Sequence, residues 1–270
     1  MRAIIPLLIA MVAAAAAGCA QKSFRGDDFM TGQYHPSGRD AIRDMLDSVS
    51  SISKKSPETF AVEFYVDGTL GDKKYKLLGS AQGDRRRKVM HISFLDFIFR
   101  SGIAMFFQEG DDIRIYYPVE KKLYVDRAGT IDLARYGGVS IDYGLLYDIA
   151  TGTFPIVTDY TVKEGLAANN GTGSILILEN KRFYETISFN GKNPDKILFV
   201  NKQTRERFEI YVKKIALQGN SVFFANVVVV AQQSRFRLDI HFNRIVLNAP
   251  LEVRTLKDVK LPKGVQIIEM

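Results

Sequence analysis

Apolar and polar residues alternate with a period of two along most of the chain, which is the pattern of half-buried β-strands. The clearest case is Phe236, Leu238, Ile240 and Phe242 alternating with Arg235, Arg237, Asp239 and His241. Residues 60–66 and 75–81 alternate in the same way around a Gly-Asp turn, and a third strand is expected at 86–94. Connections this short join antiparallel neighbours, so the pattern predicts an antiparallel meander.

The second half of the chain is predicted to be nearly all strand. Turn dipeptides such as Asn170-Gly171, Asn190-Gly191 and Gly219-Asn220 separate its apolar segments. Together with two shorter strands before them, the predicted strands number about eleven in all. Beyond the opening three, they are residues 113–117, 123–125, 175–178, 185–189, 197–200, 207–213, 222–230 and 235–247.

Two regions have a helical period instead. Ser37 resembles a helix cap with Asp40 three residues on, apolar residues recur at helical spacing up to Ile52, and Pro57 follows the expected end. A mainly helical region is expected at 131–158, and Gly152 and Pro155 within it are expected to end the helix. Strands, then helices, then strands predict an α+β, mostly β fold: a single large curved antiparallel sheet with two or three helices laid across it.

Residues 94–107, FLDFIFRSGIAMFF, follow neither period although ten of the fourteen are apolar. They are too few to span a bilayer. One hypothesis is a buried helix or strand pair. The other is a protruding loop that enters lipid through Phe97, Ile98, Phe99, Ile103, Met105 and Phe106.

The first nineteen residues have the features of an export signal. Arg2 precedes an apolar run from Ala3 to Ala17, and Gly18 precedes Cys19, the only cysteine of the chain. This ending resembles the lipobox of bacterial lipoproteins, in which the cysteine becomes the acylated N-terminus. The alternative is an ordinary secretory signal that leaves a free thiol. The resemblance implies that residue 20, an alanine and not aspartate, favours the outer membrane.

The composition is that of a globular protein with an excess of cationic over acidic residues. Apolar residues make up 46% of the chain, and its formal charge is +7. The cations occur in short groups such as Lys73-Lys74, Arg85-Arg86-Arg87-Lys88 and Lys121-Lys122. Because acids are interleaved with them at turns, solvated hairpin ends are favoured over an anionic-lipid or nucleic-acid surface.

The sequence supports neither an enzyme nor a cofactor or metal site. His35, His91 and His241 have no metal-ligand spacing. Asp239 and His241 share a strand face, but it is the polar face, where a solvated pair is expected. Neither a nucleophile elbow nor a phosphate loop occurs.

The order of these parts resembles the LolA/LolB superfamily of lipoprotein carriers, and most closely LolB-like outer-membrane lipoproteins. The matching pieces are Ala17-Gly18-Cys19, the apolar residues 94–107, residues 145–152 with Pro155, and Leu261-Pro262-Lys263-Gly264-Val265. The resemblance implies a half-barrel sheet closed by helices over an apolar cavity. The expected lining is Phe60, Val62, Phe64 and Ile240 on the sheet, facing Ile42, Leu46 and Leu146 on the helices. These residues could instead fill a solid core.

The expected organisation is a signal at 1–18, a lipidated N-terminus and flexible tether at 19–36, and one binding domain at 37–270. The expected function is a lipid-anchored protein on the periplasmic side of the outer membrane that accepts acyl chains of lipoproteins or lipids, with a periplasmic carrier as donor. The alternative is a non-transporting envelope adaptor or stress sensor of the same fold. No nucleic-acid partner is expected.

Overall fold

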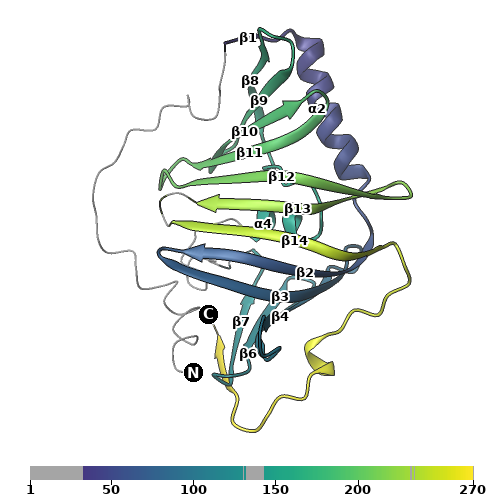
Figure 1. Ribbon diagram of the computed structural model, residues 1–270, viewed down its shortest axis with the longest axis vertical. Coiled ribbons are helices and arrows are strands. Elements are labelled where there is room, and N and C mark those ends of the chain that lie inside the picture. The colour runs from purple at the N-terminus through teal and green to yellow at the C-terminus, as the bar shows by residue number, and fades with distance from the viewer. Residues whose placement is uncertain (1–32, 130, 132–142, 232, 234, 270) are drawn as a thin grey trace.

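The computed structural model describes residues 33–129, 131, 143–231, 233 and 235–269. The described residues form one fifteen-stranded sheet, two α-helices and a short 3₁₀-helix (Figure 1). The expected signal, Cys19 and most of the tether lie outside the described residues, as do residues 132–142 of the second helical region.

The helices are α2 (Arg39–Lys54), α4 (Tyr143–Ala150) and the 3₁₀-helix η2 (Leu256–Asp258). The strands are β1 (Tyr34–Pro36), β2 (Thr59–Leu70), β3 (Lys73–Asp84), β4 (Val89–Asp96), β5 (Gly102–Glu109), β6 (Asp112–Tyr117), β7 (Lys122–Arg127), β8 (Thr161–Ala168), β9 (Gly173–Glu179), β10 (Phe183–Asn190), β11 (Asn193–Asn201), β12 (Arg207–Gln218), β13 (Ser221–Ala231), β14 (Phe236–Leu247) and β15 (Gln266–Glu269).

Two meanders make the sheet. Strands β2 to β7 form one and β8 to β14 the other, and they join where β14 pairs antiparallel with β2. At the two edges lie β1, which pairs with β8, and β15, which pairs with β7. The β7–β15 pair is parallel, so the sheet is mixed and not wholly antiparallel as expected.

The strand number of about eleven was too low, because four strands lack a clean alternation. Strands β1 and β15 are short edge strands of three and four residues. A register shift between Val162 and Glu164 interrupts β8. Strand β5 is apolar on both faces, which hides its period.

Helix α2 begins later than the sequence predicts. Gly38 is the residue that precedes it, and no side-chain hydrogen bond caps it. Ser37 instead continues the strand pairing of β1, since its N–H donates to the carbonyl of Gly165 at 2.8 Å. The predicted end before Pro57 is confirmed, because the helix ends at Lys54.

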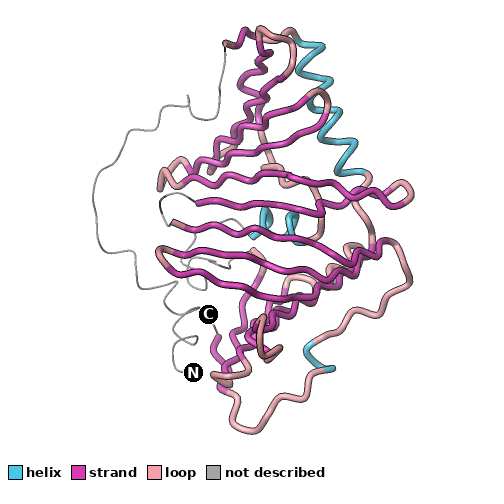
Figure 2. Tube along the Cα trace, viewed as in Figure 1, coloured by secondary structure: helices cyan, strands magenta, loops and turns pink. Residues whose placement is uncertain are grey.

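Both helices pack on one face of the sheet, called here the inner face. Met45 and Val49 of α2 share a buried cluster with inner-face residues of β9 to β13, and Ile149 of α4 joins the same cluster. Figure 2 shows α2 along one part of the sheet and α4 behind the central strands. A Cβ on Gly165 would lie 2.4 Å from Cγ1 of Ile42, so this glycine permits the close approach of α2 to β8.

The opposite, outer face is partly covered by the chain's own C-terminal segment, residues 248–265. Leu256, Val259, Leu261 and Val265 pack there against a buried cluster of Phe107, Tyr116 and Leu123. This second layer explains why β5 is apolar on both sides. Among the described residues, every helix is too short or too polar to cross a membrane.

Candidate functional site

A half-open apolar cavity of about 360 Å³ lies on the inner face, between α4 and the sheet. Strands from both meanders contribute to its wall. Residues that line it include Phe64, Val66, Leu77, Ala81, Ile92, Phe94, Ile103, Ala104, Met105, Phe106, Ile115, Tyr143, Leu146, Tyr147, Phe208, Val229, Leu238, Ile240 and Phe242. A volume of this size falls within the range of ligand pockets in proteins.

None of the described residues that line the cavity carries a charge. The lining residues with polar side chains are Thr69, Tyr75, Tyr117, Tyr143 and Tyr147. Burial raises the pKa of Tyr143, whose hydroxyl donates to Oε1 of Gln108 at 2.6 Å and ties the start of α4 to β5. A cavity with this lining favours an apolar ligand, because a charged or strongly polar group would lose its hydration without gaining partners.

Small residues on β3 give the aromatic side chains of β2 their positions. A Cβ on Gly79 would lie 2.3 Å from Cζ of Phe64, and one on Gly83 would lie 2.3 Å from Cε1 of Phe60. Each ring therefore lies across a glycine of the neighbouring strand. The ring of Phe64 reaches the cavity, whereas Phe60 joins a buried cluster beside it.

The structure brings together only part of the predicted cavity set. Phe64, Leu146 and Ile240 line the cavity. Phe60 and Val62 are buried in the adjoining cluster. Ile42 and Leu46 of α2 pack against the cluster that spans β9 to β13 and are not among the residues that line the cavity, so the structure does not support their assignment to the lining.

Residues 94–107 form a strand pair with an exposed tip, which combines the two hypotheses made from the sequence. At the β4–β5 turn, Phe97, Ile98 and Phe99 are 45%, 77% and 75% exposed. Ile103, Met105 and Phe106 lie on β5 and line the cavity, so they are wall residues and not part of a protruding loop.

The tip has a defined turn structure. One carboxylate oxygen of Asp96 accepts hydrogen bonds from the N–H groups of Ile98 at 2.9 Å and Phe99 at 2.7 Å. The N–H of Arg100 donates to the carbonyl of Asp96 at 3.0 Å. Because the backbone groups are satisfied within the turn, the three apolar side chains point outward from a fixed scaffold.

The three histidines lie on separate strands. His35 on β1 contacts Asn169, at 3.0 Å between Nδ1 and Oδ1. His91 is buried on β4, and this burial lowers its pKa to about 4, with Arg254 adding to the shift. His241 lies 2.9 Å from Asp239 and 2.8 Å from Asn226, so both of its ring nitrogens have neighbours. Among the described residues, no group of three or more potential ligands is placed to hold a metal ion.

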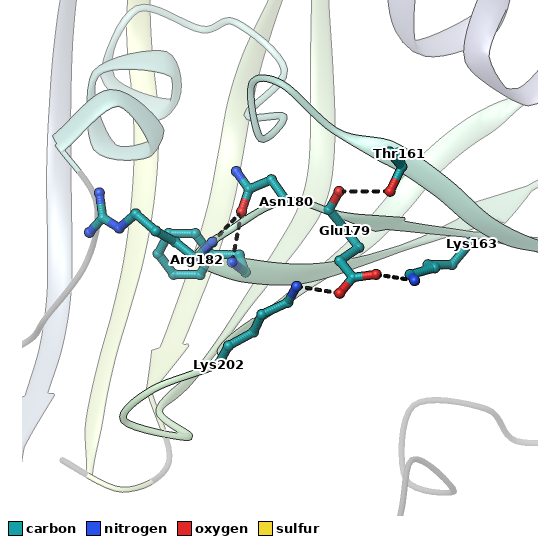
Figure 3. A network of polar contacts seen from close by, with 7 residues as sticks. Thr161, Lys163, Glu179, Asn180, Arg182 and Lys202 are labelled. Atoms are coloured by element: carbon teal, nitrogen blue, oxygen red, sulfur yellow. Dashed lines mark hydrogen bonds and ion pairs between the residues drawn. The ribbon is translucent and has the colours of Figure 1, made fainter.

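The outer face of β8 to β11 carries a network of ion pairs. Glu179 contacts both Lys163 and Lys202 (Figure 3). Nζ of Lys202 also lies 4.5 Å from the centre of the Tyr184 ring. Asn180 closes the following turn by accepting from the N–H of Arg182 at 2.9 Å. Lys163 and Lys202 are thus both paired with Glu179.

Sequence reasoning missed much of the cavity wall, notably Leu77, Ile92 and Leu238. The signal for them was present, since each lies at an inward position of an alternating strand. Alternation predicts which side chains lie on the inner face of the sheet, but not which part of that face the helices leave uncovered.

No protein-family model matches the sequence, and no curated protein matches it. Solved structures do share its fold. A domain from Vibrio parahaemolyticus assigned to outer membrane lipoprotein sorting superposes with a TM-score of 0.57 at 10% identity, covering 78% of this chain and 93% of that one. A LolA superfamily protein from Nitrosomonas europaea gives 0.54 at 11% identity, with 78% and 94% covered. A DUF1329 family protein from Desulfovibrio piger gives 0.54 at 10% identity, with 79% and 94% covered.

The chain therefore shares its fold with a LolA superfamily protein and with a domain assigned to outer membrane lipoprotein sorting. At these identities the likeness shows the fold alone.

Proposed function

We propose that the protein is a lipid-anchored carrier of the cell envelope, which holds acyl chains of lipoproteins or lipids in its cavity and helps to insert them into the outer membrane. The single observation that carries this proposal is the uncharged cavity under α4, lined by apolar and aromatic side chains. Its LolA-type fold adds support, since one structural neighbour is assigned to lipoprotein sorting. A periplasmic carrier protein is proposed as the donor.

Binding of a fluorescent fatty acid tests the cavity directly. We expect saturable binding with emission shifted to the blue, because the probe leaves water for an apolar site. Solvent extraction of the purified protein followed by mass spectrometry should also release a lipid. Failure of both would favour a protein of this fold that does not transport, such as an envelope adaptor or stress sensor.

Cys19 is proposed as the site of acylation, on the evidence of the lipobox-like sequence before it. Cys19→Ser should abolish incorporation of radiolabelled fatty acid and leave a protein that is soluble or unprocessed. Two or three acyl chains anchor firmly, whereas one holds only marginally, at about 0.8 kcal/mol for each buried CH₂. A wild-type protein without label would contradict the proposal.

The tip of the β4–β5 turn is proposed to contact the membrane during delivery. Ile98→Glu in a Cys19→Ser background should weaken vesicle binding about tenfold or more, since burying one such side chain is worth about 1.5 to 3 kcal/mol. Leu217→Glu is the matched control, because Leu217 is 75% exposed and Ile98 is 77% exposed. Co-sedimentation with vesicles measures both variants, and an equal loss in both would contradict a role for the tip.

A further inference from the structure

Three turns lie at the same end of the sheet, next to the cavity, and are called here the mouth rim: β2–β3 with Lys73 and Lys74, β4–β5 (97–101), and β6–β7 (118–121). Antiparallel alternation places them together. Leu77, which lines the cavity, pairs with Asp96 at the start of the β4–β5 turn. A Cβ on Gly102 would lie 3.6 Å from Cγ of Pro118, so the β4–β5 and β6–β7 turns are neighbours.

A second turn of the rim also carries an exposed apolar side chain, in addition to those of the β4–β5 turn. Val119, in the β6–β7 turn, is 60% exposed. Its turn neighbours the β4–β5 turn, whose tip is formed by Phe97, Ile98 and Phe99. Two adjacent hairpins thus present apolar side chains in the same region, which is a larger patch than a single loop offers.

Four cations of the rim lack an acidic partner among the described residues. No ion pair joins Lys73, Lys74, Arg100 or Lys121 to another residue that the structure describes. The acids nearby are occupied. The Asp96 carboxylate accepts backbone N–H groups, Glu120 pairs with Lys122 at 3.0 Å, and Asp72 pairs with Arg235 at 3.8 Å.

Cations at the opposite end of the sheet are arranged differently. In the β3–β4 turn, Arg86 pairs with Glu58 at 2.5 Å and Lys88 pairs with Asp111 at 3.4 Å. Interleaved acids thus neutralise part of that end, as the sequence pattern suggested for the whole chain. Two of the four cations of that turn are therefore paired, whereas none of the four rim cations pairs with an acid that the structure describes.

We propose that the mouth rim docks on a membrane surface rich in anionic lipid. The apolar tips enter the interface, and Lys73, Lys74, Arg100 and Lys121 bind the negative headgroups. This arrangement sets the cavity mouth against the bilayer. The inference rests on the membrane contact proposed above and adds the lipid class to it, but it is independent of what the cavity holds.

Vesicle co-sedimentation of the full chain with Cys19→Ser tests this inference. One set of vesicles is pure phosphatidylcholine, and the other contains equal parts of phosphatidylcholine and phosphatidylglycerol. We expect tighter binding to the second set, weakened by salt because exposed charges are screened. Changing Lys73, Lys74, Arg100 and Lys121 to Gln should lower this binding at least about 100-fold, since each cation near an anionic surface is worth about fivefold.

The matched control removes the same charge from the opposite end, by changing Arg85, Arg86, Arg87 and Lys88 to Gln. We expect its binding to stay within about threefold of the parent, with far-UV circular dichroism unchanged in both variants. Equal losses in the two variants would overturn the inference in favour of attraction by net charge. Equal binding of the parent to both vesicle types would also overturn it, and would favour a protein partner for the rim.

The fatty-acid titration in solution separates this result from the proposed function. A parent protein that binds fatty acid but does not discriminate between the two vesicle types counts against the rim alone. A parent protein that prefers the anionic vesicles but does not bind fatty acid counts against the carrier function alone.

Discussion

Ile240→Trp should reduce fatty-acid binding at least about thirtyfold without lowering the thermal transition. Ile240 lies on β14 and lines the cavity, so a larger ring at this position occupies space that the ligand needs. An acyl chain gains about 0.8 kcal/mol for each CH₂ it buries, so excluding three such groups already costs roughly this factor.

Stability separates a cavity from a solid core in this experiment. Extra volume in a filled core usually costs about 1 to 3 kcal/mol, whereas a ring placed in a void adds contacts. A clear fall in the transition temperature of Ile240→Trp would therefore indicate a solid core and contradict the proposed site.

The chain offers a spectroscopic readout and a control for the same variant. It contains no tryptophan, so the introduced residue is the only indole. Emission from position 240 should be blue-shifted and should respond to added fatty acid in proportion to any residual binding. Leu217→Trp places the same ring at an exposed position of β12, and we expect water-like emission and unchanged fatty-acid affinity.

Glu185→Gln should stabilise the protein at neutral pH by up to about 3 kcal/mol. Glu185 lies on β10 with none of its surface exposed. Its Oε2 accepts the N–H of Val157 at 2.9 Å, and its Oε1 has no hydrogen-bond partner among the described residues. It therefore anchors the segment between α4 and β8 at the cost of a buried carboxyl.

Burial raises the pKa of Glu185 from 4.5 to about 8; the Val157 N–H lowers it and Asp148 raises it by smaller amounts. A raised pKa means that the folded state binds the proton more tightly than the unfolded state does. The stabilising effect of the protonated form is complete below the unfolded pKa and declines as the pH rises from 4.5 towards 8. Gln keeps the shape of the neutral carboxyl and does not titrate, so the variant lacks this decline.

Urea denaturation across this range checks the prediction. The two proteins should differ little near pH 4, and Glu185→Gln should become the more stable one as the pH rises towards about 8. Parallel curves for the two proteins would show that Glu185 titrates as an exposed carboxyl does. Thr186→Val, at the neighbouring residue on the other side of the strand, should leave the slope with pH unchanged.

The sequence by itself determined the local structure, because local structure depends on neighbours along the chain. Alternation located the inward side chains of β2, β3 and β14, and the helical period with Pro57 located α2 and its end. It also located an apolar stretch without a period at 94–107. Glycine and asparagine pairs identified the tight turns at Gly171, Gly191 and Gly219, each of which has a positive φ.

Only the tertiary structure decided what those faces contact. A period of two assigns Phe60, Phe64 and Ile240 to one face, but α4 leaves space beside Phe64 and Ile240 while Phe60 is buried in a packed cluster. Similarly, β5 is apolar on both faces because the C-terminal segment, more than a hundred residues later, covers its outer side.

The tertiary structure also decided which charged residues form ion pairs. The sequence shows acids interleaved with its short groups of cations, yet an ion pair requires two side chains within about 4 Å. Strand register brings Arg86 to Glu58 and Lys88 to Asp111, whereas Arg100 and Lys121 have no such partner among the described residues. The buried state of Glu185 follows from the same cause, since the segment that covers it is far from it in sequence. Contacts between distant segments depend on packing, and packing leaves no period in the chain.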